Sequence, residues 1–402
     1  MTTPARPRIT DPQRRARVMV RHRLAASTRT DDIAAVAESV VALHSSDPAS
    51  VYLSAFARMA NPSVDAVSHA LYEARSVVRH HAMRRTVWVF TPEVGRWAHA
   101  ACTEAIAAKE WNQLRAWVAR SGIDEPGAWL DGVTTQVLAA LHERGPLSAR
   151  QLGREVPELT RKIVIGTGNY TGEASAHTRV LQNLGFDARI VRTTPTGTWL
   201  SSEYQWQVMG DWLLDGLSGL DPADARTHLV RCYLDRFGPV TLDDVRWWTG
   251  LTAAASNAAL RTLDAVEVDL DDGRTGWVLP DDVPSTDGDI GEFGDDVVLL
   301  PSLDPTAMGW KHRSWYLGEH TTFPSALFDR NGNIGPTVWH AGRMIGGWGQ
   351  RADGTVVYEL LTAPPRGIKG AAGRAAERLT QLLDGTRVTL RFPTPLWQSL
   401  ST

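Results

Sequence analysis

Apolar residues in the first 125 positions recur with a helical period, except in one segment that alternates as a strand does. The helical period recurs in four segments, at 11–24, 31–43, 48–59 and 61–74. We predict that the first helix begins with Asp11 as its N-cap and Pro12 as its first helical residue. In RRTVWVFTPE, residues 84–93, valines alternate with other residues, which predicts a strand. A long helix then ends at Gly122.

Two later segments repeat one order of elements. RGPLSARQLGREV (144–156) and FGPVTLDDVRWWTGLTAAASNAALRTL (237–263) each combine a Gly-Pro pair, a Ser or Thr cap and a helix. Each is followed by sequence typical of a β-hairpin, at 188–202 and at 266–280. Helices followed by a two-stranded wing are the plan of a winged helix, a variant of helix-turn-helix. The N-terminal helices and their strand are a candidate third unit of this kind.

The last hundred residues change to short strand patterns, which predicts a small C-terminal β-sheet or barrel. The strands are expected at 297–305, 337–350, 354–361 and 387–393, with a helix at 371–383 before the last one. The Asp- and Gly-rich segment 281–296 is interpreted as an exposed linker. We therefore predict an α+β fold of tandem winged-helix (helix-turn-helix) units followed by this β-domain. The predicted domains are 1–125, 126–215, 216–285 and 286–402.

The composition is typical of a water-soluble globular chain of more than one domain. The 402 residues are 43% hydrophobic and 22% charged, and a chain of this length exceeds one hydrophobic core. No apolar run approaches the roughly 18 residues needed to span a bilayer, and the N-terminus has no secretory signal. We expect a cytoplasmic, nucleoid-associated monomer that has no membrane contact. Cys102 and Cys232 form no CxxC pair, so neither a disulfide nor a zinc site is expected.

The net charge of -3 hides an uneven distribution of charge along the chain. Residues 1–100 contain 14 Arg and no Lys against 8 acidic residues, whereas residues 221–300 contain 6 Arg against 17 acidic residues. A basic half that faces an anionic partner would have this layout. A solvated acidic surface that meets no partner is the alternative.

The stretch LHSSDPASVYLSAFARM, residues 43–59, contains the main candidates for chemistry. His44, Ser46 and Asp47 interrupt two strongly apolar runs. Asp47 followed by Pro48 has the form of a helix N-cap before a helix-first proline, and Ser45 and Ser46 are natural loop hydrogen-bonders. His44 has no comparable structural explanation. The loop is therefore either a capping motif or an active site.

Basic residues in two other segments, and Arg343 in the C-terminal part of the chain, are candidates for contacts with phosphate. The segment VVRHHAMRRTVW packs arginines next to two histidines, and KHR follows Trp310. The adjacent His80 and His81 do not share one helix face, so no metal site is expected. Trp310, Trp315 and Trp348 are candidates for stacking on DNA. The predicted DNA contacts are Arg58, Arg79, Arg84, Arg85, Lys311, Arg313 and Arg343.

Five stretches occur in a recognisable order between residues 40 and 351: VVALHSSDPASVYLSAFAR, HAMRRTVWVFTPE, FGPVTLDDVRWWTGL, LLPSLDPTAMGWKHR and IGPTVWHAGRMIGGWGQR. Together they resemble the winged-helix DNA-binding superfamily that includes the AlkZ-type and YcaQ-type DNA glycosylases. The resemblance implies three tandem winged-helix units and a β-domain around a DNA-sized cleft. In that family a Gln-x-Gln or Gln-x-Asp triplet is catalytic. By position His44 and Ser46 replace the first and last residues of this triplet.

The function implied by the resemblance is excision of bulky or cross-linking N7-alkylated purines from double-stranded DNA, with no cofactor. The predicted catalytic residues are His44, Ser46 and Asp47. One alternative is a non-catalytic DNA-binding module of the same fold, and another is a transcription regulator. The helix LTAAASNAALRTL offers only Asn257 and Arg261 for base readout, which disfavours a sequence-specific regulator.

Overall fold

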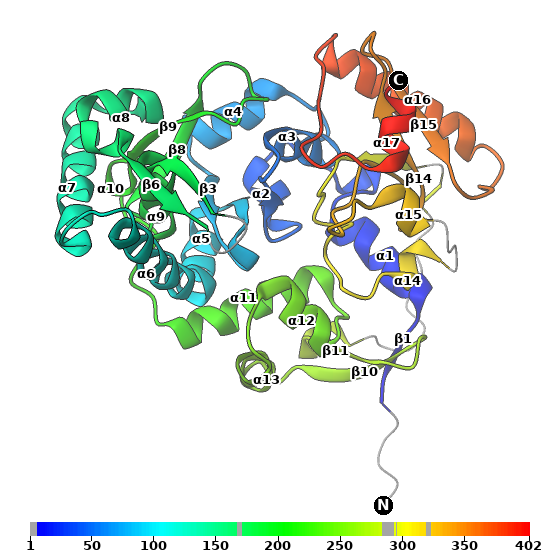
Figure 1. Cartoon of the computed structure of the whole chain (residues 1–402). Coiled ribbons are helices and arrows are strands. Elements are labelled where there is room, and N and C mark those ends of the chain that lie inside the picture. The colour runs from blue at the N-terminus through cyan, green and yellow to red at the C-terminus, as the bar shows by residue number, and fades with distance from the viewer. Residues whose placement is uncertain (1–5, 167–170, 284–292, 295, 319–322) are drawn as a thin grey trace, which may run out of the picture.

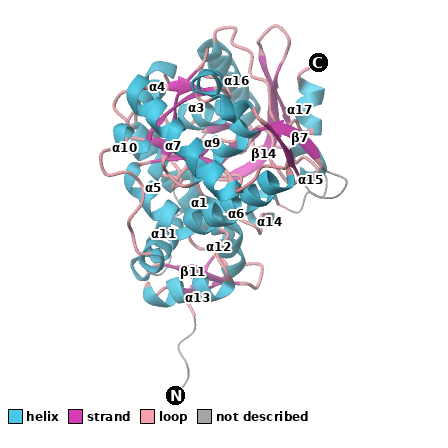
Figure 2. Ribbon diagram, turned by 60° about the vertical axis from the view of Figure 1, so that its left-hand side comes forward, coloured by secondary structure: helices cyan, strands magenta, loops and turns pink. Residues whose placement is uncertain are grey.

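The computed structural model is a mixed α+β structure in which helices surround several small sheets (Figures 1 and 2). It describes residues 6–166, 171–283, 293–294, 296–318 and 323–402. In Figure 1, α6–α9 lie at one end of the molecule and α16 and α17 at the other, while α11–α13 lie on a third side.

The N-terminal segment places helices around a three-stranded sheet of order β2-β4-β3. Its elements are α1 (Asp11–Arg21), α2 (Ile33–Glu38), β2 (Leu43–His44), α3 (Pro48–Phe56), α4 (Val64–Tyr72), β3 (Val78–His81), β4 (Val87–Phe90), α5 (Pro92–Ala98) and α6 (Glu104–Arg120). The N-cap of α1 is Thr10, which forms a capping box with Gln13, so the prediction of Asp11 as N-cap is wrong. Asp11 instead lies in the first turn, where its negative charge favours the helix N-terminus.

The second segment contains the predicted helices and wing together with an additional hairpin. Its elements are α7 (Pro126–Arg144), β5 (Leu147–Ser148), α8 (Ala149–Glu155), β6 (Lys162–Ile165), β7 (Gly172–Ser175), α9 (Ala176–Phe186), β8 (Ile190–Pro195), β9 (Tyr204–Val208) and α10 (Met209–Trp212). The predicted cap Ser148 forms a capping box with Gln151. A separate hydrophobic cluster, which includes Leu114 and Val118 of α6 and extends to Trp206 of β9, holds this segment together.

The third segment has the predicted order of three helices and a hairpin. Its elements are α11 (Pro222–Phe237), α12 (Leu242–Thr249), α13 (Ala253–Thr262), β10 (Val266–Leu270) and β11 (Thr275–Val278). Thr241 caps α12, and Gly250 ends it with a left-handed φ of 77°, as the sequence predicts. Strand β1 (Arg8–Ile9) joins the hairpin in parallel with β10, so the start of the chain is fastened to this segment.

The C-terminal segment is built on a four-stranded antiparallel sheet of order β12-β13-β14-β15. Its elements are β12 (Val297–Leu300), α14 (Ser314–Leu317), α15 (Phe323–Leu327), β13 (Thr337–His340), β14 (Arg343–Gln350), β15 (Val356–Leu360), α16 (Ile368–Leu383) and α17 (Pro395–Leu400). Residues 387–393 form no strand, so that strand prediction is wrong. Most of the predicted linker 281–296 lies outside the described residues.

One large hydrophobic cluster unites the N-terminal, third and C-terminal segments. It extends from Val18 of α1 through Trp248 of α12 to Leu396 of α17. These segments therefore share one core and fix the position of the loop between β2 and α3. Among the described residues, no helix is long and apolar enough to cross a membrane.

Candidate active site

The HSSD loop, residues 44–47, connects β2 to α3 at the edge of the N-terminal sheet. His44 pairs with Trp88 of β4, and the Ser45 N–H donates to the Val87 carbonyl oxygen at 2.8 Å. Asp47 then caps α3, which begins with Pro48. The sequence forms this connection because the apolar run before His44 pairs as a strand and the Asp-Pro pair starts a helix.

His44 is buried and neutral. Only 6% of its surface is exposed, and its ring meets the Trp88 ring edge-on at a centroid distance of 4.7 Å. Burial, followed by the positive charge of Arg84, lowers the pKa of His44 to about 3. The Ser46 N–H donates to His44 Nδ1 at 3.4 Å. Because Nδ1 accepts, the neutral ring carries its hydrogen on Nε2 and offers that atom as a donor.

Asp47 uses both carboxylate oxygens for backbone contacts. Oδ1 accepts from the Ala49 N–H at 3.2 Å and Oδ2 accepts from the Arg391 N–H at 3.2 Å. Burial raises the pKa of Asp47, opposed by these two N–H groups. The predicted capping role is confirmed, and the same side chain also fastens the C-terminal segment to the loop.

Arg79 lies beneath the loop with 4% of its surface exposed. Its Nε donates to Ser45 Oγ at 2.9 Å, one Nη donates to the Tyr72 hydroxyl at 3.1 Å, and the guanidinium lies 4.5 Å from the Tyr204 ring centroid. The prediction that Arg79 contacts a phosphate is corrected, because its side chain is enclosed by the loop and two tyrosines. Arg79 instead orients Ser45.

Arg391 is a loop contact that the sequence did not reveal. Besides the backbone bond to Asp47, its guanidinium donates to the Ser46 carbonyl oxygen at 3.0 Å. The two residues are 345 positions apart, and no local signal connects them. Because residues 387–393 were predicted as a strand, the Arg391 N–H was expected to pair within a sheet and not with Asp47. The exposed Arg391 thus lies beside the HSSD loop.

A second pair of arginines, Arg84 and Arg313, lies near His44. Arg84 stacks on Trp247 at 4.1 Å, and Arg313 lies 5.3 Å from the same ring centroid. Both are half-buried. The charge of Arg84 acts on His44 and that of Arg313 acts on Arg84, which shows that the three groups are neighbours. Neither arginine makes an ion pair among the described residues.

The remaining predicted DNA contacts separate into exposed and buried residues. Arg85 is exposed and paired with Glu110, and Lys311 is exposed and paired with Asp243 at 3.0 Å. Arg58 is fully buried and forms an ion pair with Asp304 at 2.8 Å, so its prediction as a DNA contact is wrong. A buried, paired guanidinium is part of the core. Arg343 is exposed, in a cavity lined by residues outside the HSSD loop.

The three tryptophans proposed to stack on DNA are also core residues. Trp310 and Trp348 donate their indole N–H groups to Phe237 and Leu300 carbonyl oxygens, and Trp315 packs edge-on against Trp310. Their exposed fractions are at most 4%. The prediction that they stack on bases is therefore corrected.

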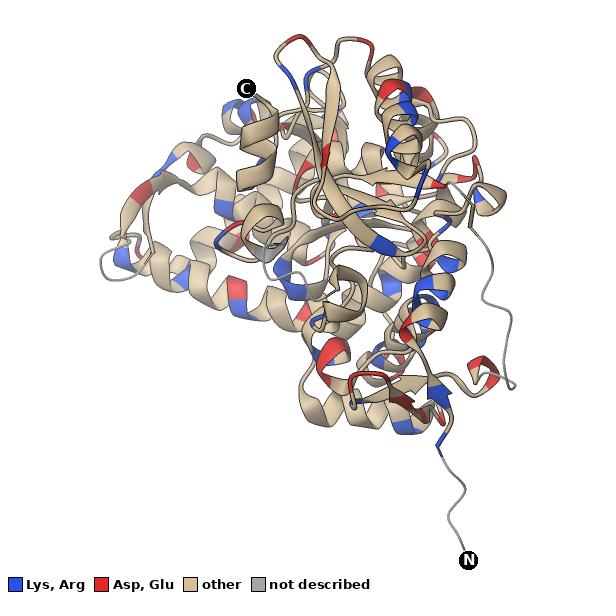
Figure 3. Cartoon of the chain, turned by 90° about the vertical axis from the view of Figure 1, so that its right-hand side faces the viewer, with Lys and Arg blue, Asp and Glu red and all other residues tan. Residues whose placement is uncertain are grey.

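Much of the basic charge of the N-terminal segment is neutralised within the molecule. Arg17 bonds to Asp282 at 2.7 Å and Arg8 to Asp271 at 2.8 Å. Acidic side chains gather at the β10–β11 hairpin, next to the N-terminal strand (Figure 3). The uneven charge of the sequence thus serves internal pairing in part. Arg84 and Arg313, which form no ion pair among the described residues, lie near His44.

The second segment contributes a polar cavity of about 1080 Å³ next to this site. Arg150, Arg154, Arg192 and His177 line it, together with Tyr204. Arg192 also donates to His81 Nε2 at 3.3 Å. Across the described part of the chain, no group of three or more His, Cys, Asp or Glu residues is arranged to hold a metal.

The family model described as DNA glycosylase AlkZ-like matches residues 37–382. The fold is similar to that of the Streptomyces sahachiroi DNA glycosylase AlkZ, with a TM-score of 0.69 and 18% sequence identity over 96% of this chain and 99% of that chain. No curated protein matches the sequence.

Proposed function

The chain belongs to the AlkZ-like DNA glycosylase family, and from that premise we propose that it hydrolyses the N-glycosidic bond of purines with bulky or cross-linking N7-alkyl groups in duplex DNA. The observation that carries this proposal is the HSSD loop. It presents a neutral histidine, held by a buried framework and surrounded by arginines without carboxylate partners.

Hydrolysis of this N-glycosidic bond needs few catalytic groups from the protein. An N7-alkylated purine is cationic and already a good leaving group, and cleavage proceeds through an oxocarbenium-like transition state, as in glycoside hydrolysis. Water must be placed against the sugar. The His44 Nε2–H can donate to that water, and the half-buried Ser46 hydroxyl can accept from it. The water loses its proton to solvent as the C–O bond forms, so His44 need not act as the base.

Asp47 has an electrostatic role in this proposal. Each of its oxygens accepts one backbone N–H group. A carboxylate next to the reaction centre still offsets positive charge that develops on the sugar. Asp47 is therefore proposed to stabilise the transition state from behind the loop, while it caps α3.

DNA is proposed to lie across the HSSD loop. Arg84 lies near His44 and Arg313 lies near Arg84, while Arg391 contacts Ser46 and lies near Arg192. Arginine forks suit phosphate oxygens, and phosphate contacts position a protein on duplex DNA. The cavity beside Tyr204 provides space for part of a DNA strand or for the bulky adduct on the base.

We further infer that the helix-and-hairpin units of the first three segments are tandem winged helices that hold the duplex, with the domain boundaries given above. In this arrangement the protein acts as a cytoplasmic monomer on DNA and requires neither metal nor cofactor. Hydrolysis of a cationic nucleoside needs only placed water and charge stabilisation.

Base release from defined duplexes tests the proposal. The protein is incubated with duplex DNA that carries one N7-methylguanine, and separately with a duplex that carries a bulkier N7 adduct, and free modified base is measured. Unmodified duplex is the control. Release of modified base from one or both alkylated duplexes, with no base released from the unmodified duplex, supports the proposal. Binding of both duplexes without release of base would identify a non-catalytic DNA-binding protein instead.

A further inference from the structure

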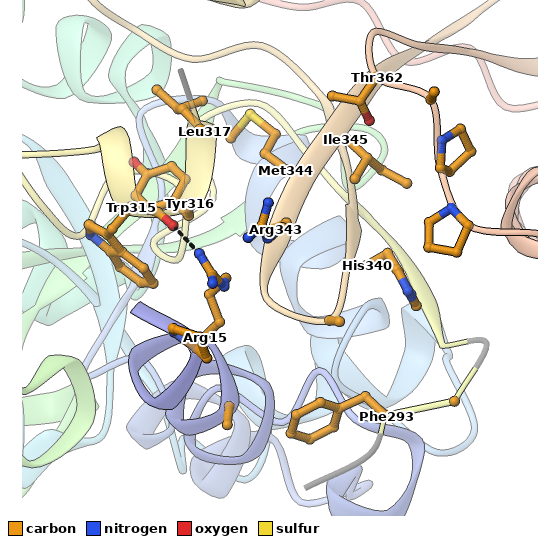
Figure 4. A pocket seen from close by; sticks show the side chains of 18 residues that line it. Arg15, Phe293, Trp315, Tyr316, Leu317, His340, Arg343, Met344, Ile345 and Thr362 are labelled. Carbon is orange, nitrogen blue, oxygen red and sulfur yellow. Dashed lines mark hydrogen bonds between the residues drawn. The ribbon is translucent and has the colours of Figure 1, made fainter. Parts of the chain in front are cut away.

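A second cavity, of about 750 Å³, lies between α1, α14, the β13–β14 hairpin and residues 362–365 (Figure 4). None of its lining residues belongs to the HSSD loop or to the arginines around that loop. Its walls are largely apolar, with Tyr316, Leu317, Met344 and Ile345 among them. The volume falls within the roughly 300–1,000 Å³ of small-molecule sites in proteins.

Two arginines face this apolar space. Arg15 comes from α1 and Arg343 from the first position of β14, and Figure 4 shows their guanidinium groups close to one another in the cavity. Burial and then the charge of Arg343 lower the pKa of Arg15. Arg15 donates to the Trp315 carbonyl oxygen at 2.8 Å, which leaves further N–H groups. Two like charges held together destabilise one another unless an anion lies between them.

The nearby carboxylates do not serve as partners for these arginines. Asp11 and Asp271 act on Arg15 only through space. Asp271 accepts from Arg8 through one oxygen and from the Asp11 N–H through the other. Among the described residues, neither Arg15 nor Arg343 forms an ion pair. The pair therefore presents unneutralised positive charge at an apolar wall.

The wall of the cavity is fixed by close packing. The turn between β13 and β14 contains Gly342 at a φ of +71°, where a Cβ atom would lie 2.5 Å from the Arg15 carbonyl oxygen. Only glycine allows this approach and this backbone conformation. The backbone of the hairpin is thus seated on α1, and the Arg15 side chain is held by its bond to the Trp315 carbonyl oxygen before a ligand binds. Such preorganisation lowers the entropic cost of binding.

From this geometry we propose that the cavity is a binding site for a small amphipathic organic anion. Its carboxylate, phosphate or sulfonate group is held between Arg15 and Arg343, and its apolar body packs against Tyr316, Met344 and Ile345. A phosphodiester of DNA matches the charge but leaves the apolar walls uncovered. The site is independent of the glycosylase reaction proposed above, because none of its lining residues lies in the HSSD loop.

A fluorescent probe of this chemical class tests the proposal. The probe is anilinonaphthalene sulfonate, an aromatic sulfonate, and its uncharged analogue N-phenylnaphthylamine is the control ligand. Binding to the wild-type chain is compared with binding to Arg15→Gln and Arg343→Gln. Arg351→Gln, which removes an exposed arginine at the far end of β14, is the matched control. Unfolding midpoints verify that each variant is folded.

We expect each cavity variant to weaken sulfonate binding by roughly tenfold or more, since a hydrogen bond to a charged group contributes about 1.5–3 kcal/mol. Arg351→Gln should bind the sulfonate as the wild type does, and the uncharged analogue should bind equally to the wild type and the three arginine variants. Ala16→Phe, which narrows the cavity from α1, should weaken both ligands. Equal sulfonate binding by all variants would overturn the proposal. Competition by duplex DNA together with weaker DNA binding by Arg343→Gln would show a DNA surface instead.

Discussion

His44 offers the same kinds of hydrogen-bonding group as the glutamine that the family resemblance implies at this position. A glutamine amide has a donor and an acceptor without charge, and a neutral imidazole also has one of each. Burial keeps His44 neutral, and the Ser46 N–H occupies its Nδ1. The sequence showed only that the family identity was replaced. In the structure His44 is buried with a lowered pKa, and its Nδ1 accepts a hydrogen bond, so its Nε2–H is the donor.

Asp47→Asn tests the double use of this carboxylate. Asparagine remains a good N-cap for α3, but it has one carbonyl oxygen for two backbone donors, so either Ala49 or Arg391 loses its acceptor. We expect the free energy of unfolding to fall by about 1–3 kcal/mol, the cost of a buried unsatisfied group. Chemical denaturation measures this. Asp32→Asn, at the exposed N-cap of α2, is the control and should change stability by only a few tenths of a kcal/mol, roughly as helix caps do.

At the scale of elements, one buried ion pair joins α3 to the segment after β12. Arg58 and Asp304 are both fully buried, and Asp304 also accepts from Ser54 Oγ at 2.7 Å. Although burial raises the pKa of Asp304, the Arg58 guanidinium holds it below the usual value. The pair connects residues 246 positions apart and so helps to position the HSSD loop at the start of α3.

Arg58→Met should therefore destabilise the fold strongly. Removing one partner leaves a buried carboxylate unpaired, which costs about 3–5 kcal/mol. Urea denaturation at neutral pH measures the loss. Arg144→Gln breaks an exposed pair with Glu155 and should cost at most about 1 kcal/mol. Equal stability of the two variants would contradict the structural role given to Arg58.

The sequence predicted individual elements best where the signal was local. Thr241 and Gly250 mark the ends of α12 because a cap and a left-handed glycine act within a few residues. It failed where the partner was distant. Residues 387–393 have a strand-like composition, but their backbone contacts Asp47, and Arg58 resembles a surface arginine until Asp304 is placed beside it. Contacts between remote segments leave no periodic signal.

At the scale of the whole molecule, Arg84 and Arg313 mark the surface that DNA is proposed to contact. Arg84→Gln and Arg313→Gln should each weaken duplex binding and reduce the slope of log K against log salt by about 0.9, since each removes one phosphate contact. Binding measured between low and moderate salt tests this. Arg274→Gln, in the acidic β10–β11 hairpin, is the control and should leave the slope unchanged.

The number of buried neutral histidines makes the whole fold sensitive to acid. Burial lowers the pKa of His22 and His44 to about 3 and that of His99 to about 4, and those of His80 and His81 lie well below the usual value. Below pH about 6.5 these histidines bind protons in the unfolded chain but remain unprotonated in the folded chain. Above that pH both states leave these histidines unprotonated, so the histidines do not reduce the free energy of unfolding there.

Stability should fall as the pH decreases from about 6.5 towards 4, by roughly 1.4 kcal/mol per pH unit for each buried histidine. Denaturation curves at pH 7 and pH 5 measure the change. Asp304, with its lowered pKa, titrates below this window and does not contribute. Equal free energies of unfolding at the two pH values would show that these histidines are charged in the folded state.

The central claim is that base release depends on the neutral donor at His44, and one single-turnover experiment tests it most directly. Release of N7-methylguanine from duplex DNA is compared for the wild type, His44→Ala and His44→Gln, together with their DNA affinities. We predict that His44→Ala lowers the rate by roughly 10²-fold, because the attacking water loses a group that positions it, with affinity unchanged. His44→Gln should retain activity. Release by His44→Ala at the wild-type rate would contradict the account.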